Sequence, residues 1–150
     1  MPARTVLVIG ASGAIGRALV ARLCADGVRV IACIRRTPLP PSLVERYTRT
    51  GLLVQERGVD VLKKASLVRA FKSHKVDVVW MLAAPLSVES ARDPAAARDV
   101  VVGGLRRLLS VMGEKGVPRI CFSDSIGSFG GAAPRDQCTA SWLVKNPNQD

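Results

Sequence analysis

TVLVIGASGAIG, residues 5–16, joins a short apolar run to three glycines spaced G-x-x-G-x-x-G. The run from Thr5 to Ile9 is rich in strand-forming residues, and the segment after Gly16 has the apolar spacing of a helix. The sequence therefore predicts a buried strand, a tight glycine turn and a helix, in that order.

The glycine turn has the properties of an anion-binding site. Gly10 allows the backbone to leave the strand sharply, Gly13 has no side chain that would block a phosphate, and Gly16 allows close packing of helix and strand. The first amide groups of the helix are unpaired and carry the positive end of the helix dipole. A turn without a ligand is the alternative, but the order strand, glycines, helix favours dinucleotide binding.

The composition of the 150 residues limits the class of protein. An apolar content of 48% suffices for one globular domain, and no apolar run is long enough to cross a membrane. Residues 1–4 are too few for a signal peptide, so we expect a cytoplasmic protein without a membrane partner. No C-x-x-C pair or histidine cluster is present, so we expect no metal site and four reduced, structural cysteines, namely Cys24, Cys33, Cys121 and Cys138.

The formal net charge of +10 raises the question of a nucleic-acid partner. The basic residues are scattered along the chain, and aromatic residues make up only 4% of it. Recognition of nucleic acids usually needs more than diffuse charge. We therefore expect no nucleic-acid partner, and a basic surface that attracts phosphorylated cofactors.

Strand-like and helical segments alternate along the chain. Strands are expected at 5–9, 29–34, 52–55, 76–84 and 119–123, and helices at 14–25, 42–49 with Ser42 as its cap, 65–73, and from 94 to 113 or 116. This alternation predicts an α/β fold, a Rossmann-type doubly wound parallel sheet in the order 3-2-1-4-5. In this interpretation residues 1–128 form a partial dinucleotide-binding domain, and residues 129–150 form an irregular tail.

The residues after the second strand bear on the choice between NAD and NADP. An acidic residue there would bind the ribose 2′-hydroxyl, whereas arginine accommodates a 2′-phosphate. This chain has Arg35 and Arg36 and no carboxylate at that point. The arginines slightly favour NADP over NAD, and two solvated surface arginines are the alternative.

Four segments together resemble the extended short-chain dehydrogenase/reductases, the group that includes nucleotide-sugar epimerases and dehydratases. They are GASGAIG at 10–16, VDVL at 59–62, LAAP at 82–85 and FSDSIGSFG at 122–130. The last of them, with Pro134 and Arg135 beyond it, is most similar to the short-chain type of L-threonine 3-dehydrogenase. Those dehydrogenases carry an aspartate where this chain has its arginines, which weakens the narrower resemblance.

The resemblance implies roles for individual residues. Gly10, Ser12, Gly13, Ala14 and Ile15 would hold the pyrophosphate of the cofactor, Asp60 and Val61 would contact the adenine, and Leu82, Ala83 and Ala84 would line the nicotinamide ribose. Ser125 matches the serine that hydrogen-bonds the substrate oxygen. A surface-turn aspartate and a loop-capping serine are the plain alternatives for Asp60 and Ser125.

The family also requires a tyrosine and, four residues later, a lysine, about two dozen residues beyond the serine. The only tyrosine is Tyr47, far too early in the chain, and counting forward from Ser125 reaches Asp150. His74 is expected to be a solvated surface residue that cannot replace the tyrosine, and Val101 stands where the family often has an asparagine. We therefore expect the N-terminal part of a longer enzyme, truncated before its C-terminal half and inactive by itself.

The function expected from these observations is that of an NAD(P)-dependent oxidoreductase or epimerase/dehydratase. Its substrate would be a small hydroxyl compound or a nucleotide sugar bound by the full-length parent. A non-catalytic dinucleotide-binding regulator or redox sensor is the alternative. The strand at 119–123 would be an exposed edge without further strands beside it, so we expect a homo-oligomer.

Overall fold

The computed structural model describes residues 4–85 and 87–124. Their five strands form one parallel sheet in the order β3-β2-β1-β4-β5, which confirms the predicted fold class and order. The strands are β1 (Thr5–Ile9), β2 (Arg29–Ile34), β3 (Leu53–Arg57), β4 (Val78–Met81) and β5 (Ile120–Phe122). The helices are α1 (Ala14–Ala25), α2 (Pro41–Thr48), α3 (Lys64–Lys72), α4 (Ser87–Arg92), α5 (Pro94–Arg98), the π-helical η1 (Asp99–Gly103) and α6 (Gly104–Lys115).

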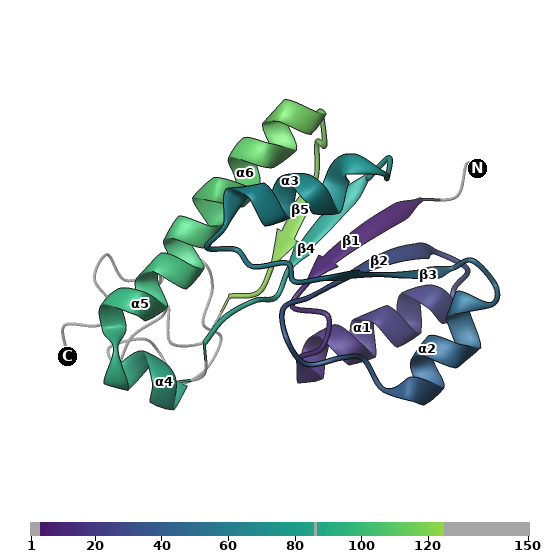
Figure 1. The fold of residues 1–150 in the computed structure, drawn as a ribbon, viewed down its shortest axis with the longest axis horizontal. Coiled ribbons are helices and arrows are strands. Elements are labelled where there is room, and N and C mark those ends of the chain that lie inside the picture. The colour runs from purple at the N-terminus through teal and green to yellow at the C-terminus, as the bar shows by residue number, and fades with distance from the viewer. Residues whose placement is uncertain (1–3, 86, 125–150) are drawn as a thin grey trace, which may run out of the picture.

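Helices cover both faces of the sheet (Figure 1). Successive residues of a strand point to opposite faces, so Leu7 and Ile9 pack in the core under α3 and α6, while Val6 and Val8 pack in the core over α1 and α2. All five residues of β1 are buried, as a central parallel strand requires. The apolar run that predicts a strand is therefore the centre of a three-layer domain.

The start of one predicted helix is wrong, and one helix was not predicted. Ser42 does not cap α2, because the helix begins at Pro41 with Pro40 at the cap position, and no side chain caps it. Proline is well suited to the first helical position, since it has no amide hydrogen that needs a partner there. The additional helix α4, which was not predicted, precedes Pro94.

The long helix predicted from residue 94 consists of α5, η1 and α6 in direct succession, and it ends at Gly116 in the left-handed conformation. The π-helical turn is spanned by an ion pair of Arg107 with Asp99, whose Nη1–Oδ1 distance is 3.0 Å. A side chain at Gly103 would overlap the Asp99 carboxylate. Glycine at this position therefore leaves room for the ion pair beside the turn.

The prediction that His74 is a solvated residue is also wrong. Its side chain is only 7% exposed, and its Nε2 lies 3.1 Å from Oε1 of Glu56 on the edge strand β3. His74 follows the C-terminal end of α3, which packs against the sheet at this point. The polar character of the local sequence therefore did not reveal the burial produced by packing.

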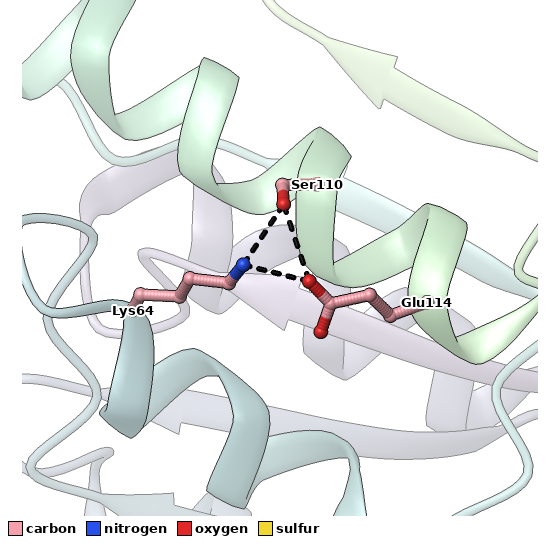
Figure 2. A network of polar contacts seen from close by, with 3 residues as sticks. All are labelled: Lys64, Ser110 and Glu114. Atoms are coloured by element: carbon pink, nitrogen blue, oxygen red, sulfur yellow. Dashed lines mark hydrogen bonds and ion pairs between the residues drawn. The ribbon is translucent and has the colours of Figure 1, made fainter.

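A surface contact joins the start of α3 to α6. Figure 2 shows Lys64 reaching across to Glu114 and Ser110, with Nζ 2.6 Å from Glu114 Oε1 and 3.0 Å from Ser110 Oγ. The hydrogen bond from Lys64 lowers the pKa of the Glu114 carboxyl below its ordinary value. Both side chains are about half exposed, so the pair contributes little to stability.

Candidate functional site

A cavity of about 490 Å³ lies where β1, β2, β3 and β4 end. Crevices at the carboxyl ends of parallel strands, where the strand order reverses, are the usual ligand sites of such sheets. The residues around the cavity come from the ends of β1 and β2, from the loops after the four strands and from η1: Ile9, Gly10, Ser12, Gly13, Cys33, Arg35, Arg36, Thr37, Val59, Asp60, Val61, Leu82, Ala83, Ala84, Pro85 and Val100.

The glycine turn forms one wall of this cavity. Gly10 has φ +83°, and a Cβ atom there would lie 2.8 Å from the backbone nitrogen of Ala83, so conformation and space both require glycine. Gly13 has the ordinary φ of −68° and a nearest neighbour, Gly10 O, at 3.4 Å from a built Cβ. The glycine at position 13 is therefore not needed for the fold itself.

The first turn of α1 presents amide groups beside Gly13. The first regular helical bond runs from Arg17 N to Gly13 O at 2.9 Å, which leaves the amides of Ala14 and Ile15 ahead of the ladder. No side chain caps the helix, and no acidic residue lies in its first turn. This bare helix start fits the pyrophosphate of a dinucleotide.

The loop after β2 supplies positive charge to the cavity. Arg35, Arg36 and Thr37 all line it, and all three side chains are exposed. Guanidinium groups bind phosphate through paired N–H groups, and a hydroxyl group can add a further hydrogen bond. The cavity thus has phosphate-binding chemistry at two places, the helix start and this loop.

The loop after β3 places Asp60 and Val61 at the cavity. The amide of Leu62 donates to Asp60 Oδ1 at 3.0 Å, and the amide of Asp60 donates to Ser66 Oγ at 2.9 Å. The side chain of Val61 is 5% exposed and belongs to the core on the α3 and α6 face. Asp60 is therefore held within a structured turn at the cavity.

The loop after β4 carries the small residues of the cavity. Leu82 continues the strand pairing, because its amide donates to Ile9 O at 2.9 Å. Ala83 and Ala84 follow, and neither side chain extends far enough to fill the space at the end of the sheet. This arrangement allows a planar ring to approach the strand ends closely.

Two cysteines of the domain have raised thiol pKa values. Burial raises the pKa of Cys24 to about 11. The pKa of Cys33 is raised well above its ordinary value, mainly by burial and to a smaller extent by the negative charge of Glu56. Both thiols are protonated at neutral pH and are poor nucleophiles. Cys24, Cys33 and Cys121 are free thiols, and Cys138 lies outside the described residues.

The structure brings ten of the twelve predicted cofactor residues to the cavity, all except Ala14 and Ile15. Those two begin α1 immediately beside Gly13, and Ile15 is 66% exposed. The predicted catalytic residue, Ser125, lies outside the described residues. Within the part of the chain that is described, no cluster of three or more His, Cys, Asp or Glu residues could hold a metal ion.

Sequence reasoning missed several residues of the cavity. Four of them adjoin predicted residues, namely Ile9, Thr37, Val59 and Pro85, and Cys33 lies two residues before Arg35. The rule that ligands bind at strand ends could have found all five. Val100 belongs to η1 and reaches the cavity through tertiary packing, for which the sequence offers no local signal. Val101, the position where the related family often has an asparagine, is 45% exposed.

Comparisons with known proteins agree with this geometry. The chain matches the model of the NAD dependent epimerase/dehydratase family over residues 6–149. It is 32% identical over 154 residues to UDP-glucose 4-epimerase 4 of Oryza sativa subsp. japonica, in a match that covers 97% of this chain and 40% of the relative.

Two solved structures are similar to the chain. The UDP-glucose 4-epimerase of Thermus thermophilus, in complex with NAD, matches with a TM-score of 0.79 and 26% identity over 94% of this chain and 44% of the other. The L-threonine dehydrogenase of Clostridium difficile matches with a TM-score of 0.75 and 26% identity over 92% and 41%. The chain therefore spans about two fifths of the length of these proteins.

Among residues 4–85 and 87–124, no helix is long and apolar enough to cross a membrane.

Proposed function

The chain belongs to the NAD-dependent epimerase/dehydratase family, and on that basis we propose that it is the dinucleotide-binding part of an oxidoreductase or epimerase. One observation supports this most directly. The glycine turn between β1 and α1 opens on the cavity at the strand ends, beside a helix start without a side-chain cap. The chemistry supplied by a bound nicotinamide is reversible hydride transfer with a carbinol carbon of the substrate.

The residues of this chain bind and orient the cofactor in the proposal. The amides of Ala14 and Ile15 hold the pyrophosphate, Asp60 accepts a hydrogen bond from the adenine amino group, and Ala83 with Ala84 leaves room for the nicotinamide ribose. Ser125 holds the substrate oxygen. A nucleotide sugar is the preferred class of substrate, because UDP-glucose 4-epimerases are among the relatives, and a cytoplasmic location stays a prediction.

Isothermal titration of the purified protein with NADP⁺ and NAD⁺ tests this proposal. We expect saturable binding of both with one site per chain. A protein that is folded by circular dichroism and binds neither dinucleotide would contradict the proposed function.

We further propose that NADP is preferred over NAD, because Arg35 and Arg36 line the cavity where a 2′-phosphate would lie. Replacing both by serine is expected to weaken NADP⁺ binding by about thirtyfold, through loss of charge-assisted hydrogen bonds, and to leave NAD⁺ binding within about twofold. The matched control is the double variant Arg46→Ser with Arg49→Ser. It also removes two exposed positive charges, one in α2 and one immediately after it, and neither arginine lines the cavity. Equal loss of both dinucleotides, or equal loss in the control, would contradict the preference.

We also propose that the protein forms a homo-oligomer through the exposed side of η1 and α6. Val102 is 38% exposed and Leu109 is 46% exposed, and they are seven residues apart on one helical face. Leu109→Glu is expected to convert the oligomer to a monomer while leaving the circular dichroism spectrum unchanged. If light scattering finds that the unaltered protein is a monomer at high concentration, the proposed oligomer does not form.

A further inference from the structure

A buried serine of α3 holds the loop that carries Asp60. Ser66 is 5% exposed, and its Oγ accepts the amide hydrogen of Asp60 at 2.9 Å. The same hydroxyl lies 2.8 Å from Asp60 O and 2.9 Å from Lys63 O, so it donates its single proton to these carbonyls. The cap residue of α3, Lys63, makes no side-chain capping bond, and Ser66 instead links the helix to the loop.

These bonds fix most of the polar groups of Asp60. Its amide binds Ser66, its carbonyl also accepts the amide of Lys63 at 2.9 Å, and its Oδ1 accepts the amide of Leu62 at 3.0 Å. The carboxylate is thereby oriented, and one oxygen is engaged. The other oxygen, Oδ2, is the one that can accept a hydrogen bond from a ligand.

A second residue of α3 holds the same loop nearer to β3. Arg69 Nη2 donates to Arg57 O at 3.1 Å and to Gly58 O at 3.2 Å. Gly58 has φ +68°, so this part of the loop turns through a conformation that glycine adopts readily. Because Arg69 is exposed, its replacement does not disturb the core.

The neighbouring Val61 is held differently. It is 5% exposed in the core, and a Cβ atom built on Gly104 of α6 would lie 2.9 Å from its Cγ2, which shows how closely α6 packs on it. Packing therefore fixes Val61, whereas hydrogen bonds fix Asp60. Removing one hydroxyl would loosen Asp60 and leave Val61 in place.

We propose that Ser66 is a positioning residue for the adenine end of the cofactor site. It holds Asp60 in the orientation that binds the adenine, and Arg69 holds the start of the same loop. The proposal rests on the proposed function, since it assigns the adenine to the loop after β3. When a ligand binds only the ordered form of a loop, its apparent affinity falls as the fraction of protein in that form falls. Loss of the hydroxyl also leaves the partly buried amide of Asp60 without its partner, which favours opening of the loop.

The test compares two fragments of the cofactor, ADP-ribose and nicotinamide mononucleotide, in Ser66→Ala. If the ordered loop falls to roughly a tenth of the population, the dissociation constant for ADP-ribose rises about tenfold. Nicotinamide mononucleotide lacks the adenine, so its dissociation constant stays within about twofold. Arg69→Gln is expected to weaken the binding of ADP-ribose about threefold by the same mechanism. Because Arg69 is exposed, we expect this variant to fold.

The matched control is Ala70→Gly, which alters a fully buried residue of the same helix that belongs to the core and makes no contact with the loop through hydrogen bonds. It is expected to lower the unfolding midpoint and to leave ADP-ribose binding unchanged. Unaltered ADP-ribose affinity in both Ser66→Ala and Arg69→Gln would overturn the proposal, as would an equal loss in Ala70→Gly. Failure of the unaltered protein to bind either NADP⁺ or NAD⁺ would instead contradict the proposed function, and this measurement comes first.

Discussion

Gly13→Ala is expected to weaken binding of NADP⁺ by about a hundredfold, or about 2.7 kcal/mol, while leaving the protein folded. The added methyl group would stand beside the free amides of Ala14 and Ile15, where the pyrophosphate is proposed to bind. The fold tolerates it, because Gly13 has φ −68° and a built Cβ meets only Gly10 O, at 3.4 Å. Gly13 is the N-cap residue of α1, where alanine is less favourable than glycine, so we expect the free energy of unfolding to fall by no more than about 1 kcal/mol.

Isothermal titration and urea unfolding measure the two quantities on the same preparation. Gly113→Ala is the matched control, since it makes the same chemical change in α6, where a built Cβ meets nothing within 4 Å. It should leave NADP⁺ binding unchanged and raise stability slightly, as expected for alanine in place of a helical glycine. NADP⁺ affinity within threefold of the unaltered protein in Gly13→Ala would contradict the assignment of the pyrophosphate site.

Gly16→Ala is expected to produce the opposite result, a loss of about 3 kcal/mol of stability or failure to fold. A built Cβ at Gly16 would overlap Gly10 O and lie 2.8 Å from Ala11 Cα and 2.9 Å from Ala11 C. These are backbone atoms of the glycine turn, and they cannot move aside without displacing β1 or α1. Gly16 thus allows the helix to approach the strand.

Urea unfolding followed by circular dichroism measures the effect of Gly16→Ala. Gly13 and Gly16 belong to one turn, but their variants report different effects. Gly13→Ala tests access of the ligand to the turn, and Gly16→Ala tests the packing of α1 on β1. A Gly16→Ala protein as stable as the unaltered one would show that α1 does not pack against β1 as described.

The parts of the fold that the sequence predicts well are those with a strong local cause. The bounds of β1, α1 and β2 agree with prediction, because a continuous apolar run marks a strand buried on both faces and glycines end the neighbouring segments. The segment at 76–84, predicted as a strand that runs into a turn of small residues, contains β4 only at Val78–Met81, so the strand begins two residues later than predicted. Its apolar character continues beyond the pairing, into the loop that lines the cavity.

Other features depend on contacts between distant segments and have no local signal. His74 is buried by the packing of α3 on the sheet, and Val100 reaches the cavity through the π-helical turn. In the sequence, nothing distinguishes Ser66 from other polar residues of a helix. Its role is visible only in the structure, where its hydroxyl contacts the loop at Asp60. The predicted cofactor residues came together because loops after parallel strands share one edge of the sheet.

The most direct test of the account is amide chemical-shift mapping in ¹⁵N-labelled protein titrated with NADP⁺ and then with nicotinamide mononucleotide alone. The account predicts saturable shifts with NADP⁺ at three separate places, the amides of Ala14 and Ile15, that of Asp60, and those of Ala83 and Ala84. Nicotinamide mononucleotide should shift the Ala83 and Ala84 amides and leave that of Asp60 unchanged. Absence of saturable shifts at the glycine turn, or shifts confined to surfaces outside the cavity, would contradict the account.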